Sequence, residues 1–328
     1  MRYTAITRTL RVFVVALLAI VPTAEALSAG GSPGKLRQTV NKAVDLFKPL
    51  YYALELKVAS QSIPNVSDMD TRMTLKENPF DASKGIAFDH SKWDVVLKRH
   101  VKVGTGTIGD VSGINMVDYE GITKDADFAA YLQQLEEAGP SKLQPAEQLA
   151  FWMNAYNALC INVVVQHEKK NKNVKVDSIT NLTTKDSGPV WDQIAGKVAG
   201  EELSLNNIEH DNLRKVWDEP LVHACINCAS ASCPNLRPEA FVVDRLETQM
   251  DEQMREWLKN DSKGLRLTDE NRLELSRIFL WFGADFGNSK GIRKFLPHYI
   301  EDEKIRNKIA KDQVTVRYFE YGWQINRA

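Results

Sequence analysis

The longest strongly apolar stretch beyond the N-terminal region covers residues 145–165 and predicts a buried central helix. Pro145 stands at the first position, where proline suits the start of a helix. Apolar residues lie around most of the helical circumference, which is typical of a helix inside a core. One stripe at i, i+3 and i+4 spacing carries Glu147, Asn154 and Asn157. Buried amides need hydrogen-bond partners, so Asn154 and Asn157 either anchor neighbouring loops or line a pocket.

Shorter patterns before and after this segment predict a mixture of helices and strands. Apolar residues at helical spacing predict further helices within 36–60, 119–135, 205–217 and 240–258. Alternating or β-branched runs predict strands at 221–226 and 314–319 and a small hairpin at 197–203. Glycines at 104–109 predict a flexible loop. The order lacks a regular βαβ rhythm, so we predict an α+β fold: a long buried central helix packed with a small, mostly antiparallel sheet and surrounding helices.

The N-terminal residues have the three parts of a secretory signal peptide. Arg2, Arg8 and Arg11 precede an apolar run at 12–21, and small residues suited to cleavage follow at 24–26. The run is shorter than the roughly 20 apolar residues that span a membrane. We therefore expect cleavage, a secreted or endomembrane-lumenal protein, and no membrane span in the mature chain. An uncleaved membrane anchor is the rival interpretation. The same segment is also compatible with bipartite organelle targeting.

Three parts are predicted along the chain. Residues 1–26 form the signal peptide, 27–78 a helical appendage with a polar linker, and 79–328 the main domain. Three glycosylation sequons agree with a secretory route, and they begin at Asn65, Asn181 and Asn260.

Composition and charge narrow the classes of partner. The chain has 328 residues, of which 43% are hydrophobic and 26% charged, as in ordinary globular proteins. The formal net charge of -1 gives no electrostatic reason to expect nucleic acid. We expect a small-molecule or peptide ligand and no bound metal or cofactor.

Candidate chemistry is concentrated in residues 223–234, where three of the four cysteines follow a histidine. An oxidising compartment and small intervening residues favour a disulfide between Cys228 and Cys233. The second interpretation is a nucleophilic cysteine served by a histidine base. A zinc site is the third, because Cys225 and Cys228 have the spacing of half a structural site, although no second Cys/His pair stands at usual spacing elsewhere.

His223 and the cysteine pair are too far apart along the chain to touch in an extended conformation. On a strand at 221–226, His223 and Cys225 would share one face. Cys228 lies five residues beyond His223, too far for contact in an extended chain that rises about 3.3 Å per residue. His223 and Cys228 meet only if the backbone bends around Asn227.

Five segments together resemble one known family. They are residues 147–158, 203–210, 223–234, 281–286 and 321–326. In this order they resemble the domain of unknown function 547 (DUF547) family, and the resemblance runs from about Trp93 to residue 328. The family has no established biochemistry, so the resemblance implies membership rather than an activity. It also implies that Cys228 and Cys233 are the important pair, because Cys225 stands where the family has a plain apolar residue.

Two functional hypotheses follow. The first is a cysteine-dependent hydrolase or acyl transferase with Cys228 as the nucleophile. In this hypothesis His223 or His210 is the base, and Asp285 orients it. The residues expected to contact substrate are Asn154, Tyr156 and Asn157.

The second hypothesis is a non-catalytic binding or interaction module. A disulfide between Cys228 and Cys233 would staple its binding loop. The sequence leaves open whether the protein is an enzyme.

Overall fold

The computed structural model describes residues 63–66, 71–85, 87–171, 174–183, 188–269 and 271–328. These residues belong to one compact unit, Ile63–Ala328. The predicted signal peptide and most of the predicted helical appendage lie outside the described residues. Within the described part, no helix is long and apolar enough to cross a membrane.

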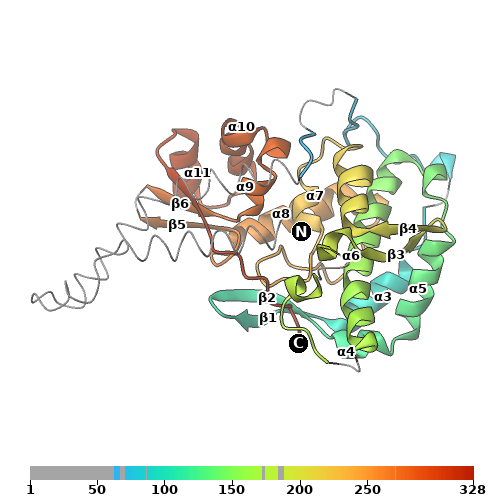
Figure 1. Cartoon of the computed structure of the whole chain (residues 1–328). Helices are drawn as coiled ribbons and strands as arrows, with labels where there is room; N and C mark the ends of the chain where they lie inside the picture. Colours follow the sequence, from blue (N-terminus) through green and yellow to red (C-terminus); the bar gives the residue numbers. More distant parts are fainter. Residues whose placement is uncertain (1–62, 67–70, 86, 172–173, 184–187, 270) are drawn as a thin grey trace, which may run out of the picture. The chain divides into compact units, whose positions relative to one another are not determined.

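Helices make up most of the regular structure in the described residues (Figure 1). The α-helices are α3 (Ser91–His100), α4 (Tyr119–Thr123), α5 (Ala126–Glu136), α6 (Pro145–Lys170), α7 (Val222–Cys225), α8 (Leu246–Lys259), α9 (Ile278–Trp281), α10 (Asn288–Phe295) and α11 (Glu303–Ala310). A π-helical segment is η6 (Asn207–Arg214). Short 3₁₀ turns are η2 (Ala82–Lys84), η3 (Pro140–Lys142), η4 (Ile179–Leu182), η5 (Val190–Asp192), η7 (Val243–Arg245), η8 (Gly283–Phe286) and η9 (Leu296–His298).

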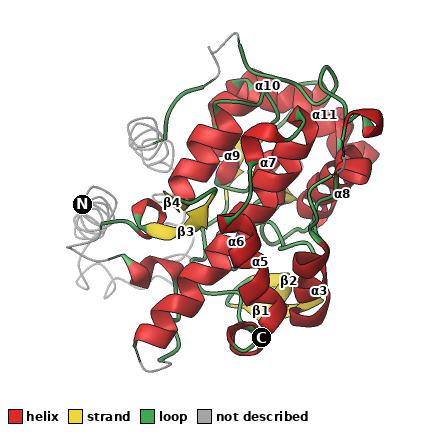
Figure 2. Cartoon of the chain, turned by 90° about the vertical axis from the view of Figure 1, so that its right-hand side faces the viewer, coloured by secondary structure: helices red, strands yellow, loops and turns green. Residues whose placement is uncertain are grey.

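The strands of the described residues form three small sheets, and Figure 2 shows some of these strands as short yellow arrows among the helices. The antiparallel hairpins are β1 (Val101–Ile108) with β2 (Val111–Val117), and β3 (Ile194–Val198) with β4 (Glu201–Ser204). In the third sheet, β5 (Leu265–Asp269) pairs antiparallel with β6 (Arg272–Leu275), and β6 pairs parallel with β7 (Thr315–Tyr318). The predicted α+β class is therefore confirmed, with several small sheets around the helices.

Helix α6 is the centre of the larger hydrophobic core, as its all-round apolar pattern predicts. Helices α4 and α5, hairpin strand β3 and the π-helical η6 all pack against it. Pro145 occupies the first turn. The long helix and its neighbours form the right-hand part of Figure 1.

A second, smaller core lies around the later part of the chain. It is built from α8, α9, α10 and the sheet β5–β6–β7, drawn in orange and red in Figure 1. Helix α7 joins the two cores, because Val222 and Cys225 belong to the first and Ala224 to the second. The segment with the candidate chemistry therefore begins where the two cores meet.

The predicted strand at 221–226 is wrong, because residues Val222–Cys225 form helix α7. A short apolar run cannot distinguish a strand from a buried helix by its periodicity. The backbone N–H of His223 donates to the carbonyl of Pro220 at 3.2 Å, so the chain already turns before α7 begins. His223 and Cys225 therefore do not share the face of a strand.

Other local predictions are confirmed or shifted in their boundaries. The hairpin near 197–203 is confirmed as β3–β4, and the strand near 314–319 as β7. The helix predicted at 119–135 is divided into α4 and α5, because Asp125 caps the backbone N–H groups of Asp127 and Phe128. The glycine-rich segment 104–109 is not a free loop but runs largely within strand β1.

Candidate active site at the cysteine loop

The cysteine loop, residues 226–234, leaves the end of α7 and turns back on itself. Its backbone is fixed by Asn157 on α6, whose Oδ1 accepts from Asn227 N at 2.8 Å and whose Nδ2 donates to the carbonyl of Cys225 at 2.9 Å. Asn227 Nδ2 in turn donates to the carbonyl of Pro234 at 2.7 Å. Ala229 adopts a left-handed conformation with φ of 62°. These contacts define the bend that the sequence required around Asn227.

A segment far along the chain, residues 321–326, pairs with the cysteine loop. Ser230 and Ile325 form an antiparallel bridge, and Ala231 N donates to the carbonyl of Gln324 at 2.8 Å. Gly322 N donates to Ser232 Oγ at 2.8 Å. This pairing places the side chain of Tyr321 against the loop.

The sulfur of Cys228 is surrounded by hydrogen-bonding groups. Cys233 Sγ lies 2.9 Å away, Ser230 Oγ 3.3 Å away and the Tyr321 hydroxyl 3.7 Å away. The backbone N–H of Cys228 donates to Cys233 Sγ at 3.1 Å. We call Cys228, Ser230, Cys233 and Tyr321 the thiol cluster.

All four cysteines are free thiols in the structure. The distance between Cys228 Sγ and Cys233 Sγ exceeds the roughly 2.05 Å of a disulfide bond. The bridge that the sequence favoured is therefore not formed here, although its two partners are neighbours. Cys228 alone among the four is partly exposed, whereas Cys160, Cys225 and Cys233 are buried.

The two neighbouring thiols have opposite pKa shifts. A hydrogen bond from Cys233, aided by the Ser230 and Tyr321 hydroxyls, outweighs burial and lowers the pKa of Cys228 to about 6. Burial, together with the hydrogen bond to Cys228, raises the pKa of Cys233 well above its usual value. Cys228 is thus the thiolate of the pair near neutral pH, and Cys233 keeps its proton.

A second cluster contains ionisable groups that are almost completely buried. Arg214 on η6 donates from Nε and Nη2 to the two carboxylate oxygens of Asp285, at 2.6 and 2.8 Å. His223 Nε2 lies 2.8 Å from Asp285 Oδ2. Arg214 Nη1 lies 3.0 Å from His210 Nδ1, which accepts the hydrogen bond because Arg214 has only donors. We call Arg214, Asp285, His223 and His210 the charge cluster.

The contacts within the charge cluster and its burial determine the protonation of its members. Burial would raise the pKa of Asp285, but hydrogen bonds from His223 and Arg214 hold it well below its usual range. Burial lowers the pKa of His223 against the opposing effect of Asp285. Burial and the Arg214 charge lower the pKa of His210 to about 3. The cluster therefore contains one ion pair and two neutral histidines near neutral pH.

The structure thus divides the predicted catalytic residues into two groups. Cys228 and Cys233 lie together, and His210, His223 and Asp285 lie together. Throughout the described part of the chain, no hydrogen bond joins either histidine to a cysteine. The base–nucleophile contact expected from the sequence has no counterpart in this geometry.

The residues predicted to contact substrate are engaged in internal hydrogen bonds. Asn154 Nδ2 donates to the carbonyl of Phe241 at 2.7 Å, and its Oδ1 accepts from Phe241 N at 3.0 Å. Asn157 holds the cysteine loop as described above. The Tyr156 hydroxyl donates to Glu209 Oε2 at 3.4 Å. The two amides thus have the loop-anchoring contacts that formed one of the two interpretations of the sequence.

The site also contains residues that the sequence reasoning did not single out. Ser230, Tyr321 and Glu209 lie within the family motifs, so those motifs were the available signal. Arg214 lies beyond them and had no such signal. Lys263 is 2% exposed and donates to Asn235 Oδ1 at 2.7 Å, and burial lowers its pKa to about 8.

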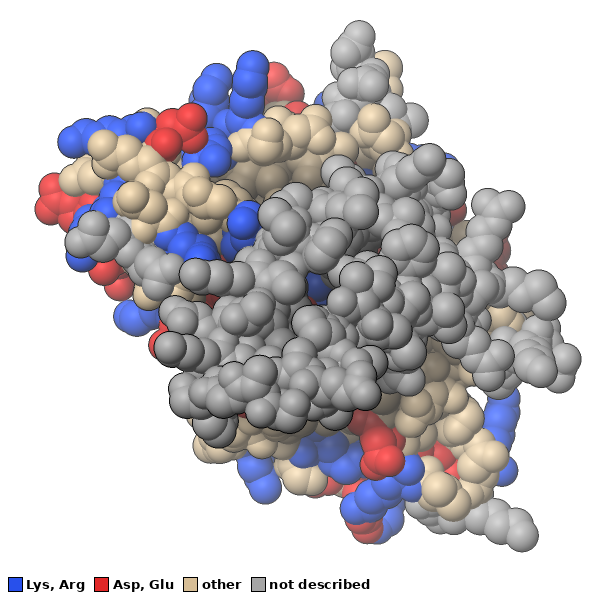
Figure 3. Space-filling model, turned by 60° about the vertical axis from the view of Figure 1, so that its left-hand side comes forward, with Lys and Arg blue, Asp and Glu red and all other residues tan. Residues whose placement is uncertain are grey.

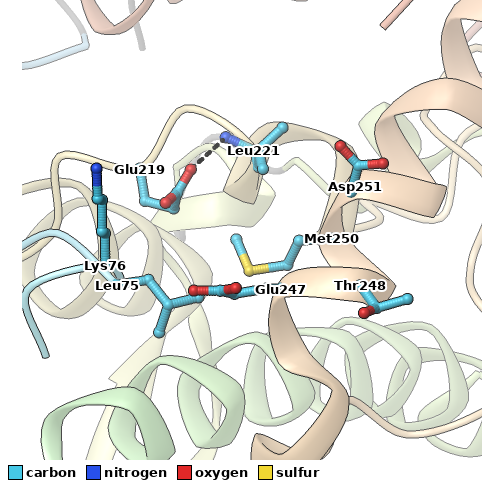
Figure 4. Close-up of a pocket in the computed structure, with 8 residues that line it drawn as sticks. All are labelled: Leu75, Lys76, Glu219, Leu221, Glu247, Thr248, Met250 and Asp251. Carbon is cyan, nitrogen blue, oxygen red and sulfur yellow. Dashed lines mark hydrogen bonds between the residues drawn. The ribbon is translucent and has the colours of Figure 1, made fainter. Parts of the chain in front are cut away.

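No group of three or more possible metal ligands occurs within the described residues. A separate pocket of about 440 Å³ contains no cysteine (Figure 4). Burial raises the pKa of Glu219 there to about 7, and its carboxylate accepts from Leu221 N at 3.5 Å. The lining residues are Leu75, Lys76, Glu219, Leu221, Glu247, Thr248, Met250 and Asp251.

Surface charges are mixed on the face shown in Figure 3. Lys and Arg side chains lie among Asp and Glu side chains in the coloured part of this face. The mixture agrees with the near-zero net charge of the whole chain.

The fold and site together define an α+β protein with a partly exposed thiol near a buried ion pair. Residues 140–258 match the profile of a family described as "Protein of unknown function, DUF547". The resemblance inferred from the motifs is therefore confirmed over these residues. The match includes α6 and the cysteine loop, whereas Asp285 and Tyr321 lie beyond it. No curated protein and no solved structure matches the chain.

Proposed function

We propose that this protein is a thiol enzyme in which Cys228 attacks a carbonyl group, as in a cysteine-dependent hydrolase or acyl transferase. The observation that carries the proposal is the environment of the Cys228 sulfur. It is the partly exposed member of the four cysteines, and three side chains that can donate a hydrogen bond lie within reach of its sulfur. Since the thiolate is the nucleophilic form of cysteine, donors that stabilise it also increase the reactive fraction.

The first step would be attack by the Cys228 thiolate on the carbonyl carbon of an ester, thioester or amide. The bond to the leaving group breaks, the leaving group takes a proton from solvent water, and an acyl-thioester forms on Cys228. Water or another acceptor then attacks the thioester and releases the thiolate. Hydroxyl groups of Ser230 and Tyr321, already directed at the sulfur, are placed to donate hydrogen bonds near the developing oxyanion.

In this proposal the charge cluster supports the loop instead of supplying a base. A Cys228 pKa of about 6 leaves most of the thiol ionised at neutral pH, so no histidine is needed to remove its proton. His223 is held by Asp285, and His210 accepts from Arg214. Both histidines are thereby fixed in place, His223 on α7 and His210 on η6.

Thiol reactivity tests the nucleophile. Under reducing conditions, iodoacetamide should modify Cys228 much faster than Cys160, Cys225 or Cys233, and mass spectrometry of peptides identifies the site. The rate should rise with pH through a midpoint of about 6, because the thiolate is the reactive form.

Two variants complete this test. Cys228→Ser should abolish the fast modification by iodoacetamide. It should also abolish formation of an acyl adduct from p-nitrophenyl acetate. Cys225→Ser is the matched control, because this buried neighbour is expected to leave both unchanged. Equal alkylation of all four cysteines, or an unchanged adduct in Cys228→Ser, would overturn the proposal.

A stapled binding module is the second candidate. The observation favouring it is the 2.9 Å distance between Cys228 Sγ and Cys233 Sγ, which leaves little movement before a bond forms. Mass spectrometry of protein isolated without reductant separates the two candidates. A complete Cys228–Cys233 disulfide in fully functional protein supports the binding module. Free thiols at both cysteines support the thiol enzyme.

We also propose that the protein enters the secretory route through its predicted N-terminal signal. Asn181 is exposed on η4, so its sequon is accessible to glycosylation. Asn260 instead uses its Nδ2 group to donate to the carbonyl of Ser112 at 2.9 Å. Removal of N-glycans should therefore shift the mass of the wild type, and Asn181→Gln should lose more of that shift than Asn260→Gln.

A further inference from the structure

Cys228 and Cys233 are two thiols whose sulfur atoms are already in contact. Their Sγ atoms lie 2.9 Å apart, so a bond between them needs an approach of less than about 1 Å. The two residues are five positions apart, so the bond closes only a short loop. They differ in their access to solvent, because Cys228 is partly exposed and Cys233 is buried. An oxidant that arrives from solvent therefore meets Cys228, and Cys233 is in contact with the sulfur that becomes oxidised.

The backbone between the two cysteines is held by groups outside the cysteine loop. Ala231 N donates to the carbonyl of Gln324 at 2.8 Å, and the carbonyl of Ala231 accepts from Lys263 Nζ at 3.3 Å. Lys263 is 2% exposed, so this contact is protected from water. Asn157 holds the beginning of the loop through Asn227 N. These contacts keep the two sulfur atoms close while both are thiols.

The same geometry suits the opening of a bond between the two sulfur atoms. An external thiol reaches the exposed sulfur of a disulfide, which here would be that of Cys228. Attack at this sulfur displaces Cys233, whose Sγ accepts the backbone N–H of Cys228 at 3.1 Å. Hydrogen bonds to a sulfur stabilise its thiolate and make it a better leaving group. Because exposed disulfides are the labile ones, the pair is suited to close and reopen.

We propose that Cys228 and Cys233 together reduce small hydroperoxides. Cys228 is the thiol that the hydroperoxide oxidises, and Cys233 is the thiol that resolves the oxidised form. This activity goes beyond the proposed acyl chemistry and does not depend on it. The partial exposure of Cys228 favours a small oxidant over a disulfide carried by another protein. A small dithiol is the reductant that completes the cycle.

Three steps make up the cycle, and each balances in atoms and electrons. First, the Cys228 thiolate attacks one oxygen of the hydroperoxide, an S–O bond forms and the O–O bond breaks. The departing oxygen takes a proton from solvent and leaves as water or an alcohol, and Cys228 becomes a sulfenic acid. Second, the Cys233 sulfur attacks the Cys228 sulfur, the S–S bond forms, the S–O bond breaks, and the hydroxyl leaves as water with the Cys233 proton. Third, the dithiol reduces the S–S bond, becomes a disulfide itself, and restores the Cys233 thiol and the Cys228 thiolate while one proton returns to solvent.

Oxidation of the full-length wild type tests the pair without any variant. The protein is reduced, freed of reductant and mixed with one equivalent of hydrogen peroxide. We expect a disulfide between Cys228 and Cys233, identified by mass spectrometry of peptides, and a loss of mass equal to two hydrogen atoms. With excess dithiothreitol, the protein should consume many equivalents of hydrogen peroxide, faster than dithiothreitol alone. Sulfinic acid at Cys228 in place of the disulfide, or no consumption above the dithiothreitol background, would overturn the proposal.

Two serine variants separate the roles of the two thiols. Cys228→Ser should lose the catalytic consumption of hydrogen peroxide. Cys233→Ser should stop at the sulfenic acid, so dimedone, which reacts with sulfenic acids, should label Cys228 in this variant far more than in the wild type. Cys225→Ser is the matched control, because its buried thiol lies outside the pair, and it should behave as the wild type. Equal labelling of Cys228 in the wild type and in Cys233→Ser would disprove the resolving role of Cys233.

A second oxidant tests the class of substrate. At equal concentration, glutathione disulfide should oxidise the pair more slowly than hydrogen peroxide does. Faster oxidation by glutathione disulfide would make the pair a thiol–disulfide exchanger and would exclude hydroperoxides as its preferred substrates.

Acylation by p-nitrophenyl acetate distinguishes this inference from the proposed acyl chemistry. If the reduced wild type consumes hydrogen peroxide but forms no acyl adduct, only the acyl chemistry is disproved. If it forms the adduct but no disulfide, only the reduction of hydroperoxides is disproved. If Cys228 carries out both reactions, the oxidised protein should form no adduct until dithiothreitol restores the thiol.

Discussion

The charge cluster and the thiol cluster are both largely buried near α7, but they stabilise their polar groups differently. In the charge cluster, the carboxylate of Asp285 is satisfied by a bidentate arginine and a histidine. In the thiol cluster, the side chains within hydrogen-bond distance of the partly exposed sulfur, among the described residues, are neutral groups. Removing one partner of a buried ion pair leaves the other charge unpaired, whereas neutral donors leave a thiolate available to react. We therefore expect the larger loss of stability from breaking the charge cluster and the larger change in thiol reactivity from altering the thiol cluster.

The largest effect is expected from Asp285→Ala. Removing this carboxylate leaves the buried Arg214 guanidinium without its ion-pair partner, which costs about 3–5 kcal/mol. Urea denaturation should show this decrease in the free energy of unfolding.

The control for Asp285 is Asp251→Ala, which breaks an exposed pair with Arg255 at 2.7 Å. Exposed pairs contribute less than about 1 kcal/mol. Equal losses in the two variants would contradict the structural role of the charge cluster.

A smaller loss of stability is expected from Asn157→Ala. The change leaves Asn227 N and the carbonyl of Cys225 without their buried partner, at a cost of about 1–3 kcal/mol. Because Asn157 also anchors the cysteine loop, the midpoint of Cys228 alkylation should move to higher pH. Asn171→Ala removes an exposed hydrogen bond to His167 and should change neither measurement. If Asn157→Ala lowers the free energy of unfolding but leaves the pH midpoint of Cys228 alkylation unchanged, then Asn157 anchors the loop without affecting the ionisation of Cys228.

The smallest effect on stability and the most selective effect on reactivity should come from Tyr321→Phe. This change removes one hydroxyl donor from the Cys228 sulfur and keeps the ring that packs on Trp281 and Trp323. We expect the alkylation midpoint to rise by about one pH unit, the equivalent of one modest hydrogen bond. Tyr318→Phe serves as a control on strand β7. An unchanged pH midpoint of Cys228 alkylation would show that Ser230 and Cys233 stabilise the thiolate without Tyr321.

Local sequence patterns predicted the main elements of the fold and failed where a short segment was ambiguous. The all-round apolar pattern of 145–165 identified α6, because only a buried helix accommodates it. Residues 221–226, five apolar residues and His223, fit a strand and a buried helix equally well, and packing between the two cores decided for α7.

The candidate site was predicted in its residues but not in its arrangement. The cysteine pair was found because its members are close in sequence. The contact of Tyr321 with Cys228 joins residues 93 positions apart, and that of Arg214 with Asp285 joins residues 71 apart. No local pattern contains such pairings, and they follow from tertiary packing alone.

The pairing of residues 321–326 with the cysteine loop also sets an order of events during synthesis. The loop is made well before Tyr321, so for about 93 further residues the nascent chain contains Cys228 and Cys233 without the segment that later pairs with their loop. Domains fold as their segments become available, and contacts between distant segments form late. Before residues 321–326 are synthesised, these two thiols lack the segment that later pairs with their loop. We therefore expect non-native disulfides and other thiol modifications to form more readily on the nascent chain than on the folded protein.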